Sequence, residues 1–581
     1  MKKIIIILAI SLIIFGIFLR VISLDKDFTG EETDFVSPAI AISQTGHPIF
    51  YHSEQQPREI ALWHPPMYIF LMGLIFKISF SEMAARSINF IFSILTAILI
   101  FLFCKNILTS KGGKEIGLIA SVFFLFNYYI LSSSIIIDID IFSTFFVFGF
   151  IYFVIMYSQE NKKSYFIFSA LFLLFGLANR YPMTILAYVG IGIYYSEILK
   201  KPHTKVYGEF PNPKNERRTH RFSDFKKESK NYFKKYLLIG ILASLIFVLI
   251  WGVYSTLIEP GNFLSFIKHN SKFGISQFSD LKIYIASFLL NISQFVRLFT
   301  IPATILMLSS FIYFFKRKEK EIRTLLIYIL SILIFFLIVP RPAFGYPRYF
   351  MTIFPGVSIL ISLFLWENLN EKKFGKKEYV FSSLIFILSF LFLIIFNPQL
   401  TNYESDGLIL ATNIPDFLFN ISASIPFILF LFMKDKRKFL ILALIALMIS
   451  YSLFFNFKFI NYNSHIKETG EYLNSVTSDD DILIVPKAIG FYSERRYYVN
   501  ENNKPLLDLS PLYLLNYIQK SYENRKMNEE FFWPGGIYGR LYLPQPSNEE
   551  LSKVSYVVLY YPAKGIEYER KIGDFYIYNV R

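Results

Sequence analysis

The stretch MYIFLMGLIFKISF (residues 67–80) decides how the chain is arranged in a membrane. It is apolar, but it is shorter than the roughly 20 residues that a transmembrane helix needs, and Lys77 would enter the hydrocarbon if it crossed. We therefore expect an interfacial helix that lies along the membrane surface. The rest of the topology depends on this segment, because each crossing reverses the side on which every later loop lies.

Longer apolar runs recur from residue 4 to about residue 459 in a chain that is 54% hydrophobic. They predict a polytopic α-helical membrane protein with about thirteen transmembrane helices. We place these helices at 4–22, 84–104, 116–133, 139–157, 164–179, 182–199, 237–257, 296–315, 324–340, 348–366, 379–396, 415–433 and 439–458.

The basic residues fix the orientation. If 67–80 does not cross, the strongly basic loops all fall on one side: 105–115, 158–163, 200–236, 316–323, 367–378 and 434–438. The positive-inside rule then predicts a cytoplasmic N-terminus for a multi-pass protein of the cell membrane. The net charge of +15 is explained by these loops and by contact with membrane lipids, so we expect no nucleic-acid partner.

The composition changes after residue 459. We expect a transmembrane domain over 1–459, with a first external loop at 23–83, and a small extracytoplasmic α/β domain over 460–581. A helix is predicted from His465 to Leu473. Strands are predicted at DILIVP (481–486), YYVN (497–500), VSYVVLYY (554–561) and FYIYNV (575–580).

Ionisable residues from distant parts of the sequence gather at the external surface in this topology. The candidate catalytic residues are acids: Glu31, Glu32, Asp34 and Asp138. The candidate substrate-binding residues lie near span ends or open the interfacial helix: His64, Arg86, Asp140, Arg180, Arg348 and Tyr349. Each has an ordinary alternative. Acids of an external loop are often only solvated, which we favour for Asp25 and Asp27, and an arginine at a helix end often anchors the helix in the interface.

Glycosyl transfer is the chemistry that such a set of residues favours. A carboxylate can act as general base on an acceptor hydroxyl, and arginines can bind the phosphate of a lipid-linked donor. The alternative is a transporter or flippase of a lipid-linked or anionic solute, which would place charges near the middle of the membrane. An envelope polymerase or ligase of related fold is a third interpretation.

The order of these features resembles the GT-C glycosyltransferases, and among them the protein O-mannosyltransferases and the bacterial lipid A aminoarabinose transferases. The resemblance rests on an acidic pair in the first external loop, Gly46 fifteen residues later, His-Pro-Pro at 64–66, the EMAAR stretch at 82–86, an Asp opening the fourth span, and Arg348-Tyr349 before a late helix.

The resemblance implies a sugar donor on a polyprenyl phosphate, transfer outside the membrane, and a first-loop acid near the reacting centre. Spacing from Gly46 puts Glu31 where these families usually have Asp, with Asp34 as an alternative base, and Asp138 fits their second acid. Ser37-Pro38 predicts a helix start there, with a turn over 31–36.

No cluster of His and Asp has metal-ligand spacing, so we expect no obligatory metal or other cofactor. The donor is a substrate in this interpretation. The sequence leaves open which sugar is transferred, whether a divalent metal assists the transfer, and whether the acceptor is a lipid, a glycan or a protein.

Overall fold

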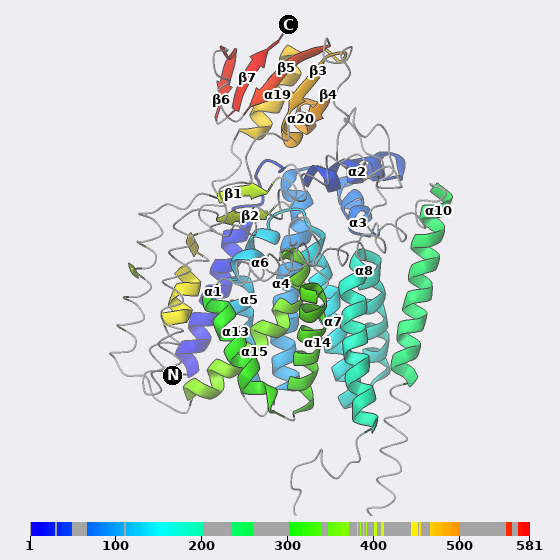
Figure 1. Cartoon of the computed structure of the whole chain (residues 1–581), viewed down its shortest axis with the longest axis vertical. Helices are drawn as coiled ribbons and strands as arrows, with labels where there is room; N and C mark the ends of the chain where they lie inside the picture. Colours follow the sequence, from blue (N-terminus) through cyan, green and yellow to red (C-terminus); the bar gives the residue numbers. More distant parts are fainter. Residues whose placement is uncertain are drawn as a thin grey trace, which may run out of the picture.

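The structure is a computed structural model, and it shows a bundle of helices with a small sheet at one end (Figure 1). The described residues are 2–29, 32–48, 65, 67–109, 112–200, 234–258, 301–317, 319–338, 347–370, 380, 384, 387–388, 391, 400–403, 408–411, 443–450, 453–454, 465–499, 553–559, 567–573 and 575–580.

The helices of the bundle pack around one apolar core. In chain order they are α1 (Lys2–Val21), α4 (Glu82–Ile107), α5 (Gly113–Leu125), α6 (Tyr128–Ser133), α7 (Ile139–Glu160), α8 (Lys163–Lys200), the π-helical η3 (Val248–Val253) with α10 (Tyr254–Ile258), α13 (Ile301–Phe315), α14 (Lys320–Ile338), and the 3-10 helix η5 (Pro347–Ile353) with α15 (Phe354–Asn370).

Five stretches of described helix are long and apolar enough to cross a membrane: Glu82–Ile107, Ile139–Glu160, Lys163–Gly192, Lys234–Leu257 and Phe350–Asn368. Four of them fall on one predicted span each, and Lys163–Gly192 falls on two, 164–179 and 182–199. The total of about thirteen stays a prediction. Apart from single positions in the first of them, the predicted spans 379–396 and 415–433 lie outside the described residues, and 439–458 is described only at 443–450 and 453–454.

One predicted span, 116–133, is wrong as a continuous helix. The chain breaks at Asn127, between α5 and α6. The Asn127 side chain accepts hydrogen bonds from the backbone N–H groups of Tyr129 (2.9 Å) and Ile130 (3.2 Å). An asparagine that caps in this way starts a new helix, which is why the apolar run does not continue as one.

Helix α8 consists of two halves joined at Arg180, whose backbone is non-helical (φ −147°, ψ 83°). In the first half, the ring of Phe172 lies against Gly149 of α7. In the second half, Tyr188 lies beside Phe150 of α7, with ring centroids 6.2 Å apart. Residues from the two halves of α8 therefore contact adjacent positions of α7, Gly149 and Phe150. The chain reverses at Arg180, as the two spans predicted on either side of it require.

Helices α2 (Glu32–Thr45) and α3 (Met67–Phe76) lie at the end of the bundle that carries the sheet (Figure 1). They cross at Gly73, where an added side chain would approach that of Ile42 to 2.6 Å. Helix α3 has 10 residues. It is about 15 Å long, too short to cross a hydrocarbon core of about 30 Å. This length agrees with the interfacial helix expected at 67–80.

The predicted start of α2 is wrong. The helix begins at Glu32 and contains Pro38, whereas a turn over 31–36 and a start near Pro38 were expected. Glu32 reaches back to accept a hydrogen bond from the Thr29 N–H (2.7 Å), as an acid in the first turn of a helix does. Pro38 removes one helical hydrogen bond, and burial of Phe35 and Val36 in the core with α3 offsets that loss.

The sheet is built from the last part of the chain, in the strand order β4-β3-β5-β7-β6. Its strands are β3 (Ile482–Val485), β4 (Arg496–Val499), β5 (Val554–Leu559), β6 (Arg570–Ile572) and β7 (Phe575–Asn579). Strand β3 runs parallel to β4 and β5, and β7 runs antiparallel to β5 and β6. Four of these strands fall on the predicted stretches.

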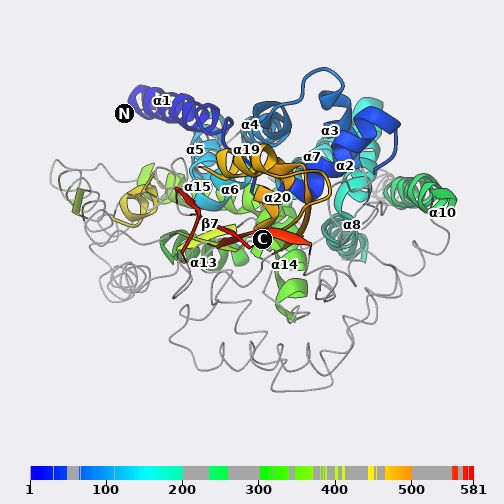
Figure 2. The ribbon, with the colours of Figure 1, turned by 90° about the horizontal axis from the view of Figure 1, so that it is seen from above.

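Two helices of this C-terminal unit, α19 (Ile466–Val476) and α20 (Lys487–Ser493), lie over the end of the bundle that carries α2 and α3 (Figures 1 and 2). Helix α19 covers the predicted helix. A separate antiparallel pair, β1 (Leu400–Tyr403) and β2 (Leu408–Ala411), lies in the predicted external segment 397–414.

Candidate active site

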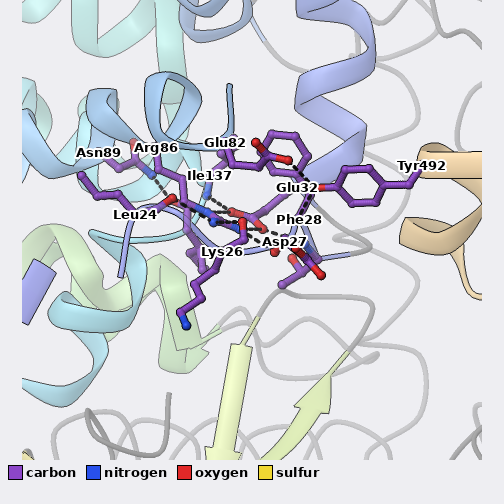
Figure 3. Close-up of polar contacts among 12 residues, drawn as sticks. Leu24, Lys26, Asp27, Phe28, Glu32, Glu82, Arg86, Asn89, Ile137 and Tyr492 are labelled. Carbon is purple, nitrogen blue, oxygen red and sulfur yellow. Dashed lines mark hydrogen bonds and ion pairs between the residues drawn. The ribbon is translucent and has the colours of Figure 1, made fainter. Parts of the chain in front are cut away.

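A buried ion pair joins the first loop to α4 (Figure 3). The side chains of Arg86, near the start of α4, and of Glu32, at the start of α2, are 2% and 1% exposed. Arg86 Nε donates to Glu32 Oε1 at 2.8 Å, and Arg86 Nη2 donates to Glu32 Oε2 at 2.7 Å. Two parallel bonds of this kind hold both planar groups in one orientation.

The other N–H groups of Arg86 bind the chain that follows α1. Nη1 donates to the carbonyl oxygens of Leu24 (3.1 Å) and Lys26, and Nη2 donates to that of Asp27 (2.9 Å) (Figure 3). All five N–H groups of the guanidinium thus have acceptors. Arg86 therefore shapes this loop.

The carboxylate of Glu32 is equally occupied. Besides the two bonds from Arg86, Oε2 accepts from the Thr29 N–H at 2.7 Å and Oε1 accepts from the Ile137 N–H at 2.8 Å. Glu32 thereby connects three parts of the chain: the first loop, α4, and the segment just before α7. Four donors around one buried carboxylate favour a structural role over proton transfer.

Asn89 organises the same segment before α7. Its amide nitrogen donates to the carbonyl oxygens of Ile136 (2.7 Å) and Asp138 (2.6 Å), and its oxygen accepts from the Tyr68 hydroxyl (3.1 Å). Asp138 is 5% exposed and caps α7 by accepting from the Asp140 N–H at 3.2 Å. Sequence analysis missed Asn89, although a buried amide near one end of an apolar span is a signal that could have found it.

A second buried ion pair joins Asp140 and Arg180. Asp140 lies in the first turn of α7, and Arg180 lies where α8 reverses. Next to them, the Asn179 amide donates to the carbonyl oxygen of Ile139 at 3.0 Å. The turn of α8 is therefore fixed to the same end of α7 that Asn89 and Glu32 contact.

Asp34 faces the C-terminal unit. Its side chain is 20% exposed and forms an ion pair with Lys487, the first residue of α20. The expectation that Asp27 is only solvated is wrong, because its Oδ2 accepts a hydrogen bond from the Lys467 N–H at 2.9 Å. Lys467 and Lys487 were not singled out from the sequence.

Four predicted site residues are not placed in full. Glu31 and His64 lie outside the described residues. Arg348 and Tyr349 lie on η5, and their side chains are outside the described part of the chain. The described residues contain no group of three His, Cys, Asp or Glu side chains that could hold a metal ion.

The comparisons with known proteins agree on the fold. The model of the family described as dolichyl-phosphate-mannose-protein mannosyltransferase matches residues 63–208. The structure is similar to that of ArnT from Cupriavidus metallidurans bound to undecaprenyl phosphate, with a TM-score of 0.57 and 12% identity, covering 95% of this chain and 92% of that chain. The apo state of the same protein gives a TM-score of 0.54 and 11% identity over the same shares. No curated protein sequence matches significantly.

These findings confirm the predicted resemblance to GT-C glycosyltransferases at the level of the fold. The family match extends from just before α3 to just beyond α8, and so includes Arg86, Asp138, Asp140 and Arg180. It does not include the acids of the first loop.

Proposed function

We propose that this chain is a membrane glycosyltransferase that moves a sugar from a polyprenyl-phosphate donor to a lipid, glycan or protein acceptor at the extracytoplasmic face. The observation that carries the proposal is the convergence of the first loop, α4, α7 and the turn of α8 at one end of the bundle through buried acid–arginine pairs. The fold supports it, since the similar ArnT structure holds undecaprenyl phosphate.

The reaction is a displacement at the anomeric carbon of the sugar. A base takes the proton of the acceptor hydroxyl, whose oxygen attacks that carbon. The bond from the sugar to the phosphate oxygen breaks, and polyprenyl phosphate leaves. Arginine is suited to the leaving phosphate because its planar fork offers two donors and its charge does not titrate.

The contacts of the first-loop acids suggest how their roles divide. Glu32 is occupied by four donors, and Asp34 is paired with Lys487. We therefore assign the general base to Glu31, which the family spacing also favours. The donor is proposed to be bound by Arg348, His64 and Tyr349. The first turn of α7 and the turn of α8 beside the site are proposed to be held in place by Asp138, Asp140 and Arg180. No metal is assigned a role.

The alternative, a transporter or flippase of a lipid-linked or anionic solute, requires charge within the membrane. Among the described residues of the bundle and first loop, the buried charged side chains are Arg20, Glu32, Arg86, Asp138, Asp140 and Arg180. Each lies near a helix end or at the reversal of α8. Buried charges at helix ends favour a reaction at the membrane surface over transport of a solute through the membrane.

Two measurements test the proposed function. Mass spectrometry of the purified protein should detect a co-purified polyprenyl phosphate. In a reconstituted assay, a polyprenyl-phosphate sugar should be consumed, with release of polyprenyl phosphate only when an acceptor is present. Movement of an intact donor across proteoliposomes without cleavage of the sugar–phosphate bond would support the transporter instead.

A further inference from the structure

The C-terminal unit contacts the first loop through a docking interface, which consists of Asp27, Phe28, Asp34 and Glu82 on one side and Lys467, Lys487 and Tyr492 on the other. At one end of it, Asp27 accepts the Lys467 N–H in the first turn of α19. The residue before α19, His465, provides no side-chain cap, so Asp27 supplies the capping acceptor from another part of the chain.

The charged contacts of this interface share one sign pattern. Lys467 Nζ donates to Glu82 Oε1 at 2.9 Å, and Lys487 pairs with Asp34. The C-terminal unit supplies both lysines, and the membrane part supplies both acids. Each pair is partly exposed, with side-chain exposures of 43% and 14% in the first and 24% and 20% in the second.

Tyr492 of α20 adds uncharged groups of its own to the docking interface, beside the pair of Lys467 and Glu82. Its hydroxyl accepts the Phe28 N–H at 2.9 Å and donates to Glu82 at 3.1 Å (Figure 3). Its ring stacks on that of Phe28, with centroids 6.0 Å apart. Tyr492 and its neighbour Phe491 extend the apolar core of α2 and α3, so the interface is continuous with the first-loop core.

The residues just before Glu31 are thus held from two sides. The carbonyl of Asp27 binds Arg86 while its carboxylate binds α19. The N–H of Phe28 binds Tyr492, and the ring of Phe28 lies 5.5 Å from the Arg86 guanidinium. Docking therefore acts on the same short segment that the buried ion pair shapes.

We propose that Lys467 and Lys487 are positioning residues, which dock the C-terminal unit on the first loop and thereby hold the loop that carries the catalytic base. This inference rests on the proposed function. It predicts that release of the unit lowers turnover while leaving the affinity for the lipid donor unchanged, because both lysines are already paired with acids of the membrane part, Glu82 and Asp34.

The first experiment measures docking without reference to activity. Spin labels are placed at Gln44 and Ser475, which are exposed on α2 and α19, in a Cys104→Ala background that removes the only cysteine. Double electron–electron resonance should give a narrow distance distribution in the parent. Lys467→Glu with Lys487→Glu should broaden it, and Lys571→Glu, an exposed lysine on β6, should not. An unchanged narrow distribution in the double variant overturns the docking role.

The second experiment measures turnover and donor affinity in the same proteins. The double variant should lose turnover on the order of ten- to a hundredfold, the range expected for a misplaced base, with an unchanged Kd for polyprenyl phosphate. The exchange Asp34→Lys with Lys487→Asp should restore both the narrow distance and most of the turnover relative to Lys487→Asp alone.

The outcomes separate the two proposals. A broadened distance with normal turnover overturns the positioning role, although docking stands. The positioning role is also overturned if the exchange of Asp34 and Lys487 restores the narrow spin-label distance but not turnover. Asp34 would then take part in the chemistry itself. If the parent transfers no sugar from any donor, the proposed function fails, and the distance measurement still decides whether the lysines dock the unit.

Discussion

The guanidinium of Arg86 and the carboxylate of Glu32 are joined by two parallel hydrogen bonds of 2.8 and 2.7 Å, and every remaining bonding position on both groups is filled by backbone. The two side chains come from helices α2 and α4, and they are 54 residues apart in sequence. Their pairing explains how the first loop is fixed to the bundle.

The first prediction concerns this pair. Arg86→Met leaves the Glu32 carboxylate buried without its charge partner, and we expect the free energy of unfolding to fall by about 3–5 kcal/mol. Arg317→Met is the control, because Arg317 pairs with Glu367 but its side chain is 33% exposed, and its loss should cost about 0–1 kcal/mol. Unfolding in detergent measures both. Equal effects would contradict a structural role for the buried pair.

The second prediction concerns the base. Glu31→Gln keeps the shape of the side chain and removes its basicity, so turnover should fall by about a hundredfold to ten-thousandfold with little change in donor binding. Glu54→Gln, in the same loop, is the matched control and should be mild. The assignment is refuted if Glu31→Gln retains near-normal turnover while Asp34→Asn abolishes it, in which case Asp34 is the base.

The third prediction concerns the donor phosphate. Arg348→Lys keeps the charge but loses the planar fork, so most of the affinity for a polyprenyl phosphate should disappear. Titration of the purified variants with the lipid measures this directly. Unchanged binding in Arg348→Ala would reduce the residue to an interfacial anchor.

The fourth prediction concerns alkaline pH. Burial raises the pKa of Tyr492 above its ordinary value, and the hydrogen bond to Glu82 raises the pKa of Lys467. The docked state therefore binds these protons more tightly than the released state. Their contribution to docking is fully present below about pH 10, the ordinary value for tyrosine, and is lost as the pH rises through the raised values.

The spin-label distance between Gln44 and Ser475 should accordingly broaden above about pH 10. Circular dichroism at each pH shows whether the bundle is still folded. Tyr492→Phe should weaken this pH dependence, because Lys467 is then the one group of the two that still loses a proton. A distance that stays narrow until the helices themselves unfold would count against the contribution of both groups.

The fifth prediction concerns sidedness. Single cysteines near Gly46 and Asn502 should react with an impermeant reagent added outside, and a cysteine near Lys318 should not. Gly46 and Asn502 on opposite sides of the membrane would contradict the thirteen-helix topology, because that topology places the first loop and the C-terminal unit together.

Local sequence was sufficient for much of the fold. Apolar runs located the described spans, and the run at 67–80 contains a helix of 10 residues, which is too short to cross a membrane, as expected. Its position along the membrane surface stays a prediction. The start of α2 was predicted wrongly from Pro38, because proline favours the first position of a helix, whereas the contacts of Glu32 set the start earlier.

The partners within the site could not be predicted in the same way. Arg86 and Arg180 were expected near the acids, but nothing in the local pattern shows that Arg86 takes Glu32 and Arg180 takes Asp140. The docking contacts were missed entirely. Lys487 lies 453 residues from Asp34, and a surface lysine has no local signal that distinguishes an ion pair from solvation.

The contacts of the first loop also set an order of events during synthesis. When α1 leaves the ribosome, the carbonyl groups of Leu24 and Asp27 and the carboxylate of Glu32 have no guanidinium to bind, because Arg86 follows Glu32 by 54 residues. Asp27 and Asp34 bind Lys467 and Lys487, which are synthesised 440 and 453 residues later. The first part of the chain to enter the membrane is therefore among the last to reach its final conformation, and a nascent chain has no completed first loop until its C-terminal unit has been made.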